Sequence, residues 1–184
     1  MLKYKVLKAD RRSVTFRDFR DIFESLAYLQ ERFAINYELS PFDFTEQAAV
    51  SAFVWAAGTR QRLALAEYQV AKSKAPGKKF KRSGRADLWI DFPDQSYSLE
   101  FKVASYQATP LKLRQRLELA RNDAGCVNLE EHDYALGVLV AFVDDQKRLQ
   151  TYDDFAKEED VMLAVRIGKR KPKSCYIYFG KPSE

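Results

Sequence analysis

The sequence predicts an α/β fold in which a central mixed β-sheet is flanked by helices. One observation is the order of periodic segments over residues 40–143, where a helical pattern precedes three strand-like segments, a second helical pattern and a further strand. A second is the apolar run from Tyr134 to Val143, typical of a strand buried on both faces. A third is the lack of internal repeats, low-complexity tracts and dividing linkers, which indicates one domain over residues 1–184 with a core at about 40–143.

Two elements are expected before the core, and a buried helix opens it. The alternating pattern of residues 2–7 predicts a short half-exposed strand. Apolar residues at helical spacing predict a helix within Thr15 to Ala34. Ser40-Pro41-Phe42-Asp43 has the form of a capping box with proline at the first helical position. We therefore expect a buried helix from there to Ala57, ended by Gly58.

The middle of the chain is expected to supply three strands and a helix. Leu63 to Lys72 alternates weakly and fits a strand or the end of a helical hairpin, of which we expect the strand. Arg85 to Phe92 and Tyr97 to Ala104 are expected to pair about the turn Pro93-Asp94-Gln95-Ser96. A helix should start at Thr109-Pro110 and run to Ala124, with Gly125 as its stop.

Additional elements are expected after the core strand of residues 134–143. Asp153 to Asp160 is expected to be a short helix. Val161 to Ile167 and Cys175 to Phe179 are expected to form a final hairpin across a basic loop.

The formal net charge of +5 is unevenly placed along the chain. Two runs without acids hold 12 of the 31 positive charges, which leaves 19 basic and 26 acidic residues elsewhere, a balance of −7. The first run contains Lys72, Lys74, Lys78, Lys79, Lys81, Arg82 and Arg85, and the second contains Arg166, Lys169, Arg170, Lys171 and Lys173. A basic loop on an acidic body indicates attraction to a polyanion, with nucleic acid first. The equal alternative is a solvated loop that keeps the protein soluble.

Composition excludes several classes of protein. The lone His132 excludes sites that need two imidazoles, and Cys126 and Cys175 can form at most one disulfide, unlike a secreted scaffold. The first residues lack the apolar segment of an export signal, and the longest apolar run is too short to span a bilayer. We therefore expect a soluble, cytoplasmic protein without a membrane partner.

Chemistry-bearing side chains gather on the expected hairpin of residues 85–104. With Asp94-Gln95 at the centre of its turn, Asp87 faces Lys102 and Trp89 faces Glu100. The polar face then carries Asp87, Trp89, Asp91, Ser98, Glu100 and Lys102, and the other face carries Ala86, Leu88, Ile90, Leu99, Phe101 and Val103. Two carboxylates on a shared face suit Mg²⁺ or Mn²⁺, which prefer oxygen ligands, and the neighbouring lysine can hold a water.

Two competing interpretations accompany this set. Asp145-x-Lys147 is a second occurrence of the same short pattern, but it lies in turn-like surroundings without an acidic partner on a paired strand. The plainer alternative for the hairpin is a surface ladder of ion pairs, in which Lys102 simply pairs with Asp87 and Glu100.

These residues resemble the PD-(D/E)XK, or restriction-endonuclease-like, nuclease superfamily. Gly84 to Ile90 looks like the strand that carries its Asp, and Leu99-Glu100-Phe101-Lys102 looks like its Asp/Glu-x-Lys strand. The resemblance covers about residues 40–143 and implies an αβββαβ core, with the N-terminal strand and helix and the C-terminal hairpin as additions. Ala86 stands where the superfamily often has Pro. Pro93-Asp94 lies at the far end of the hairpin, so Asp87 is the matching residue.

The resemblance implies the site residues. Asp87, Glu100 and the backbone carbonyl of Phe101 would bind Mg²⁺ or Mn²⁺, and Lys102 would position or activate the attacking water. Many members carry a further acid upstream, for which Glu46 and Glu67 are both candidates. The basic residues from Lys72 to Arg85 would hold phosphates near the metal. A helix face with Lys112, Arg114, Gln115 and Arg116 would line the same groove or be merely solvated.

The expected function is a Mg²⁺-dependent endodeoxyribonuclease, a phosphodiester hydrolase. The alternative is a catalytically inactive, nuclease-like subunit that binds nucleic acid or another protein within a larger DNA-processing complex. A homodimer or such a complex is compatible with either function. The lack of an aromatic-rich RNA platform favours DNA over RNA as the partner.

Overall fold

A computed structural model describes residues 4–42, 45–76, 78, 82–130, 132–168 and 174–183. Within these ranges the chain forms a seven-stranded mixed sheet of order β1-β6-β7-β5-β4-β3-β2, together with four α-helices. The elements are β1 (Tyr4–Lys8), α1 (Val14–Tyr37), α2 (Glu46–Gly58), β2 (Ala64–Lys72), β3 (Arg82–Asp91), β4 (Ser96–Ala104), α3 (Pro110–Gly125), β5 (Tyr134–Val143), the 3-10 helix η1 (Gln146–Arg148), α4 (Leu149–Phe155), β6 (Leu163–Ile167) and β7 (Ser174–Gly180). The predicted α/β fold with a mixed sheet between helices is confirmed.

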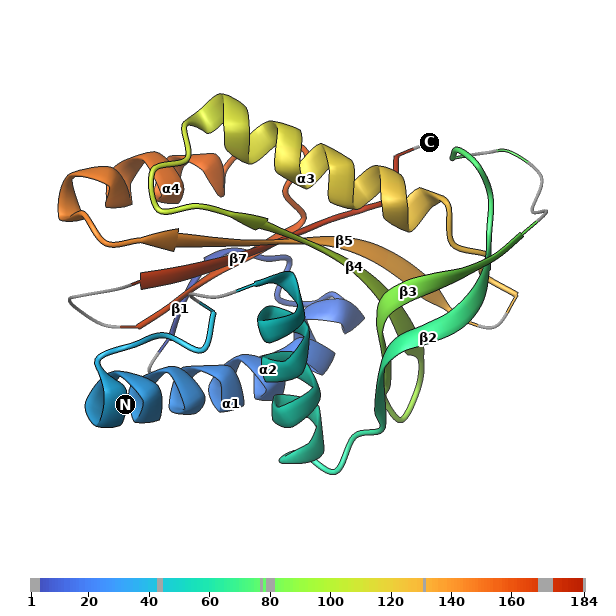
Figure 1. Ribbon diagram of the computed structural model, residues 1–184, viewed down its shortest axis with the longest axis horizontal. Helices are drawn as coiled ribbons and strands as arrows, with labels where there is room; N and C mark the ends of the chain where they lie inside the picture. Colours follow the sequence, from blue (N-terminus) through green and yellow to red (C-terminus); the bar gives the residue numbers. More distant parts are fainter. Residues whose placement is uncertain are drawn as a thin grey trace.

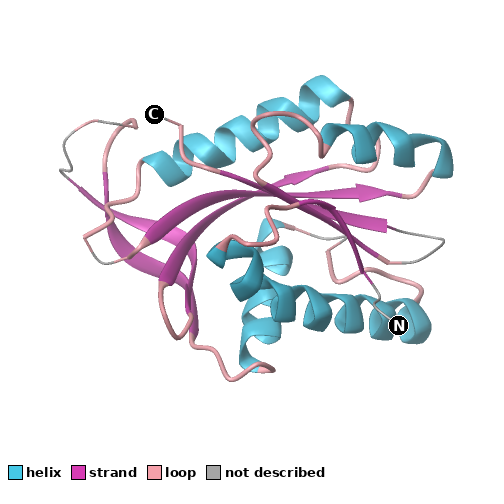
Figure 2. Cartoon of the chain, turned by 180° about the vertical axis from the view of Figure 1, so that it is seen from behind, coloured by secondary structure: helices cyan, strands magenta, loops and turns pink. Residues whose placement is uncertain are grey.

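Helices cover both faces of the sheet. Figures 1 and 2 show α1 and α2 on one face and α3 and α4 on the other. The larger core lies under α1 and α2, where Phe19, Phe23 and Phe53 meet the sheet. A second core lies under α3 and α4 and includes Leu113 and Leu117. β4 and β5 are parallel, and α3 is the crossover between them.

The helix starts differ in how well the sequence predicted them. Thr109 caps α3 and Pro110 begins it, as expected. α2 begins at Glu46 with Thr45 as its cap, so the capping box expected at Ser40 is wrong. The Ser40 hydroxyl instead donates to Gln30 of α1 at 2.6 Å in a buried contact and accepts from the Phe42 N–H. The Ser40 hydroxyl therefore holds the segment before α2 against α1 and caps no helix.

The hairpin register is two residues away from the expected one. Trp89 pairs with Ser98 and Leu88 with Leu99, so the pairings of Trp89 with Glu100 and of Asp87 with Lys102 are wrong. The reason is the turn, where the Phe92 N–H donates to the Gln95 carbonyl at 2.9 Å. Pro93-Asp94 therefore forms the centre. A register shift of two residues does not by itself move any residue to the other face.

An irregularity at Glu67 of β2 coincides with a change in the face that Ala86 of β3 occupies. Glu67 has a φ of 52°, and neither it nor Asp87 belongs to the otherwise continuous pairing of β2 with β3. Leu88 and Leu99 pack in the core under α1 and α2, but Ala86 packs with Val127 near the end of α3. The prediction that Ala86 shares one apolar face with Leu88 and Leu99 is thus wrong. The regular alternation of faces is interrupted where Glu67 and Asp87 do not pair.

The last elements only partly follow the predictions. The expected hairpin is present as β6 and β7, but the short helix lies at α4 rather than at Asp153 to Asp160. Arg166 belongs to β6 and pairs with Asp153 at 3.3 Å, so it is not part of a basic loop. Lys169, Arg170, Lys171 and Lys173 lie outside the described residues. Across the described part of the chain, no helix has the length and apolar character to cross a membrane.

Candidate active site

The candidate site lies where β3 and β4 separate. Pairing between them ends at Leu88 and Leu99, so β4 from Glu100 onward has no β3 neighbour among the paired residues. In Figure 1, β3 and β4 diverge beyond the turn that connects them, and β2 follows β3 away from β4. A strand edge that is open in this way can be reached by side chains from both helical layers.

The backbone of Phe101 joins two of the predicted site residues. Its N–H donates to Oδ2 of Asp87 at 2.7 Å. Its carbonyl oxygen accepts a hydrogen bond from Nζ of Lys102 at 2.8 Å. Asp87 on β3 and Lys102 on β4 are thereby fixed at one short stretch of backbone.

Lys102 is held by carboxylates from both faces of the sheet. Its Nζ lies 2.8 Å from Oδ2 of Asp123 in α3 and 3.8 Å from Oε1 of Glu46 in the first turn of α2. Burial lowers the pKa of Lys102, but the hydrogen bond and charge of Asp123, followed by Glu46 and Asp87, raise it by more. The net effect is a raised pKa, so Lys102 is an ammonium ion at neutral pH.

Glu100 is the most enclosed acid of the site, with only 3% of the residue exposed. Nζ of Lys72, near the end of β2, lies 2.6 Å from its Oε1. Burial raises the pKa of Glu100 to about 7, Lys72 opposes that rise, and the charge of Asp87 adds to it. Burial also raises the pKa of Asp87, against the lowering effect of the Phe101 N–H. Asp87 therefore lies close enough to Glu100 to disfavour the ionisation of Glu100.

The two candidates for the upstream acid have different surroundings. Glu46 contacts Lys102, and burial is the main cause of its raised pKa, with Lys102 opposing. Glu67 is half exposed and lies 3.8 Å from Arg85, although its charge also raises the pKa of Asp87. Glu46 is thus the candidate in contact with the expected catalytic lysine.

Two contributions were missed by the sequence analysis. Asp123 was not singled out, yet it is the nearest carboxylate to Lys102. Its position next to the buried stripe of Ala120 and Ala124 is a signal that it borders the sheet. Lys72 was expected to bind nucleic acid from a loop, but its side chain is only 15% exposed and pairs with Glu100. Nothing in the local sequence distinguishes it from the other lysines of its run.

The remaining predicted nucleic-acid contacts are scattered. Lys74, Lys78 and Arg85 are exposed beside the site strands. Lys79, Lys81 and the side chain of Arg82 lie outside the described part of the chain. On α3, Lys112 and Gln115 are exposed, and Arg116 is close enough to Glu46 to lower its pKa.

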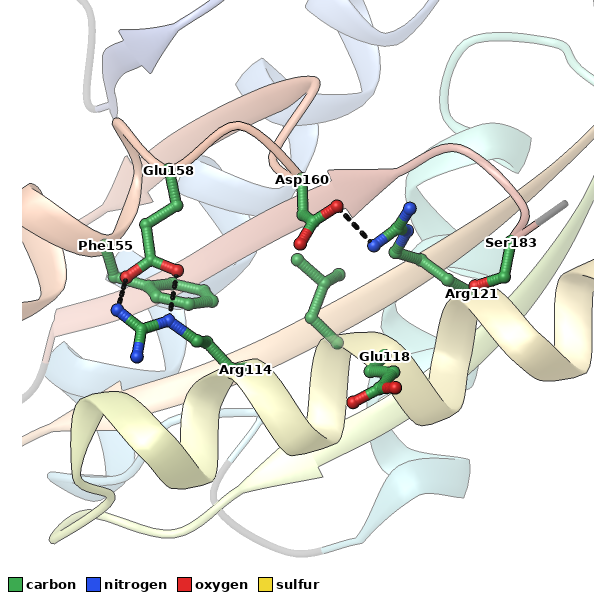
Figure 3. Close-up of a pocket in the computed structure, with 8 residues that line it drawn as sticks. Arg114, Glu118, Arg121, Phe155, Glu158, Asp160 and Ser183 are labelled. Atoms are coloured by element: carbon green, nitrogen blue, oxygen red, sulfur yellow. Dashed lines mark hydrogen bonds and ion pairs between the residues drawn. The ribbon is translucent and has the colours of Figure 1, made fainter.

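Figure 3 shows a recess outside the candidate site, between α3 and the segment that follows α4. The cavity has a volume of about 240 Å³, and its arginines are already paired. Arg114 forms two hydrogen bonds to Glu158 at 2.6 and 2.7 Å, and Arg121 lies 2.6 Å from Asp160. These pairs tie α3 to the C-terminal part of the chain, which explains them without a ligand.

The open edge of β4 offers oxygen atoms that suit a divalent cation. No three Asp, Glu, His or Cys side chains among the described residues converge closely enough to hold a metal ion as they stand. The oxygens of Asp87 and Glu100 and the Phe101 carbonyl are nevertheless of the hard type that Mg²⁺ and Mn²⁺ prefer. Four carboxylates (Asp87, Glu100, Glu46 and Asp123) surround two ammonium groups (Lys72 and Lys102), a formal balance of −2 when all are ionised. The residues thus fit a divalent cation by donor type and charge.

Comparisons with protein-family models, with curated proteins and with solved structures found no match to this chain.

Proposed function

We propose that this protein is a divalent-metal-dependent nuclease that hydrolyses DNA phosphodiester bonds. The observation that carries the proposal is that Asp87 and Lys102 bind the backbone N–H and the carbonyl of the same residue, Phe101, next to the buried carboxylate of Glu100. The element order from α2 to β5 is that of the αβββαβ core of the nuclease superfamily that the motif resembles. On this proposal the restriction-endonuclease-like core spans about residues 40–143.

The chemistry of each residue follows from its surroundings. Asp87, Glu100 and the Phe101 carbonyl would hold Mg²⁺ or Mn²⁺, which when bound supplies a water of lowered pKa and stabilises charge on phosphate. Lys102 stays protonated because of Asp123 and Glu46, so it acts as a hydrogen-bond donor to the water or the phosphate rather than as a base. Glu46 and Asp123 orient Lys102 and do not touch the substrate.

The charge distribution supports a polyanionic substrate. Lys74, Lys78 and Arg85 are exposed beside β2 and β3, which carry Lys72 and Asp87. Phosphate contacts from such residues position nucleic acid without reading its sequence. Affinity for DNA should therefore fall steeply as the salt concentration rises.

The proposal is tested with purified protein and fluorescently labelled single- and double-stranded DNA, with Mg²⁺, Mn²⁺ or EDTA. We expect cleavage that requires the metal and is reduced by at least about a thousandfold in Lys102→Met and Asp87→Asn. Lys147→Met, which changes the exposed lysine of the second Asp-x-Lys pattern, is the matched control and should cleave as the wild type does. Equal behaviour of wild type and Lys102→Met on every substrate would contradict enzymatic function.

A second candidate is a nuclease-like protein that binds nucleic acid without cleaving it. It is favoured by one observation, that the ammonium groups of Lys72 and Lys102 already contact Glu100 and the Phe101 carbonyl. This candidate predicts salt-dependent binding that is the same with Mg²⁺ and with EDTA, and no cleavage. Binding that tightens with metal, together with cleavage, would exclude it.

A further inference from the structure

We infer that Lys72 is the resident counter-cation of Glu100, and that a divalent cation binds this site by displacing the Lys72 ammonium group. The inference rests on the metal site of the proposed function and assigns to Lys72 a role in setting its metal affinity. It changes Lys72 from a nucleic-acid contact into a residue that competes with the metal for the same carboxylate.

Lys72 is placed by backbone contacts on both sides. The Asn128 N–H donates to the Ala71 carbonyl at 2.9 Å, and the Ser73 N–H donates to the Cys126 carbonyl at 2.9 Å. Lys72 itself forms an isolated bridge with Val127. The end of β2 is therefore anchored to the segment that follows α3, and this fixes the start of the Lys72 side chain.

The stem of the side chain crosses a glycine. A Cβ atom added to Gly84 would lie 2.9 Å from Cδ of Lys72 and 3.1 Å from its Cβ and Cγ. Any larger residue at position 84 would thus push the lysine aside. The methylene groups of Lys72 pack over Gly84, and its ammonium group ends at Glu100. Such packing is typical of an ordered side chain rather than of a solvated surface lysine.

The contact between Lys72 and Glu100 is an ion pair. Nζ of Lys72 lies 2.6 Å from Oε1 of Glu100, and both side chains are largely shielded from solvent, with 15% and 4% exposed. Oε1 is buried, so the Lys72 ammonium group is the positive charge that faces this oxygen in the absence of metal. A divalent cation at this oxygen would supply more charge at the same place and would repel the ammonium ion.

The first test measures metal affinity without nucleic acid. Mg²⁺ is titrated by isothermal calorimetry at pH 8.5 into wild type, Lys72→Met and two controls. Lys72→Arg keeps the positive charge, and Lys74→Met removes an exposed charge two residues away. We expect roughly tenfold tighter binding in Lys72→Met and affinities within about twofold of wild type in both controls.

The second test uses the wild-type chain, so it does not depend on the folding of a variant. Lysines are methylated reductively under limiting reagent, with EDTA or with Mg²⁺ at the concentration that saturates the calorimetric signal, and each site is quantified by mass spectrometry. Displacement should raise the modification of Lys72 several-fold, since its side chain is only 15% exposed when paired. Exposed Lys74 is the internal control and should not change.

The outcomes separate this inference from the proposed function. Tighter Mg²⁺ binding in Lys72→Met, or metal-induced exposure of Lys72, supports the exchange even where no DNA is cleaved. Unchanged or weaker binding in a folded Lys72→Met protein overturns it, and so does unchanged labelling under saturating Mg²⁺. A wild-type protein and a variant that both fail to bind Mg²⁺ overturn the inference and the metal site together. Metal-dependent cleavage without exchange leaves the proposed function standing alone.

Discussion

Asp123 and Lys102, which come from different layers of the fold, are joined by a 2.8 Å ion pair. Asp123 lies in the last turns of α3, and Lys102 lies on the strand that precedes this helix. The contact depends on how closely α3 approaches the sheet. Gly137, which pairs with Glu100 across β4 and β5, is the residue over which the helix passes. The charge state of the candidate catalytic lysine is therefore linked to helix packing.

Replacing Asp123 tests whether it positions Lys102. We expect Asp123→Asn to lower kcat of the proposed nuclease roughly tenfold with little change in KM, because the lysine loses its nearest charge but the substrate loses no contact. Asp123→Glu should restore part of the rate. Glu118→Gln, an exposed change on the same helix, is the control. A rise in KM alone, with kcat unchanged, would contradict the positioning role.

Glu100 should make folding stability depend on pH. Its pKa is raised from 4.5 to about 7 in the folded chain, so the folded state holds the proton over that interval and loses stability as the pH rises through it. Glu100→Gln removes this dependence. The stability of the variant minus that of the wild type should rise by about 3 kcal/mol between pH 4.5 and pH 8. Urea unfolding at several pH values measures it.

The control for that titration is Glu118→Gln, whose side chain is exposed on α3. Its stability difference from wild type should stay flat over the same pH interval. A flat profile for Glu100→Gln as well would show that the Glu100 carboxyl is not perturbed by burial.

Gly137→Ala should be strongly destabilising. The added Cβ would lie 2.5 Å from the Arg121 backbone nitrogen and 2.6 Å from the Ala120 carbonyl carbon, so α3 would have to move. We expect a loss of about 3 kcal/mol in the free energy of unfolding. Gly58→Ala is the matched control, because a Cβ there meets nothing within 4 Å. Thermal melts of the two variants should move in opposite directions or differ by several degrees.

The backbone at Glu67 provides a fourth prediction. A φ of 52° is unfavourable for glutamate, so Glu67→Gly should hold or raise stability despite lying in a strand. Gln69→Gly, at an exposed position of the same strand, should cost about 1 kcal/mol. Chemical denaturation of both variants decides. A larger loss for Glu67→Gly than for Gln69→Gly would mean that the left-handed conformation at this residue is not strained.

The sequence predicted the parts of the site that depend on local patterns. Period-two alternation placed Glu100 and Lys102 on one face, and that held when the register moved by two residues, because a shift of two preserves the face. The start of α3 at Thr109-Pro110 followed from capping chemistry. The mixed α/β sheet followed from the order of apolar periods, since burial of apolar faces decides which elements can pack together.

Local sequence patterns did not predict the roles of residues whose contacts lie in another secondary-structure element. Ser40 has the sequence of a helix cap but is used by Gln30, ten residues away. Lys72 looks like the other lysines of its run until β2 bends and brings it to Glu100.

By itself, then, the sequence determined the fold class, the alternation of faces along β4 and the residue types that can hold a cation. Only the tertiary structure decided which of Glu46 and Glu67 touches Lys102, and that Asp123 and Lys72 belong to the site. The physical reason is range. Periodicity and capping act within a few residues, whereas Coulombic pairing and close packing join any groups that the fold brings together.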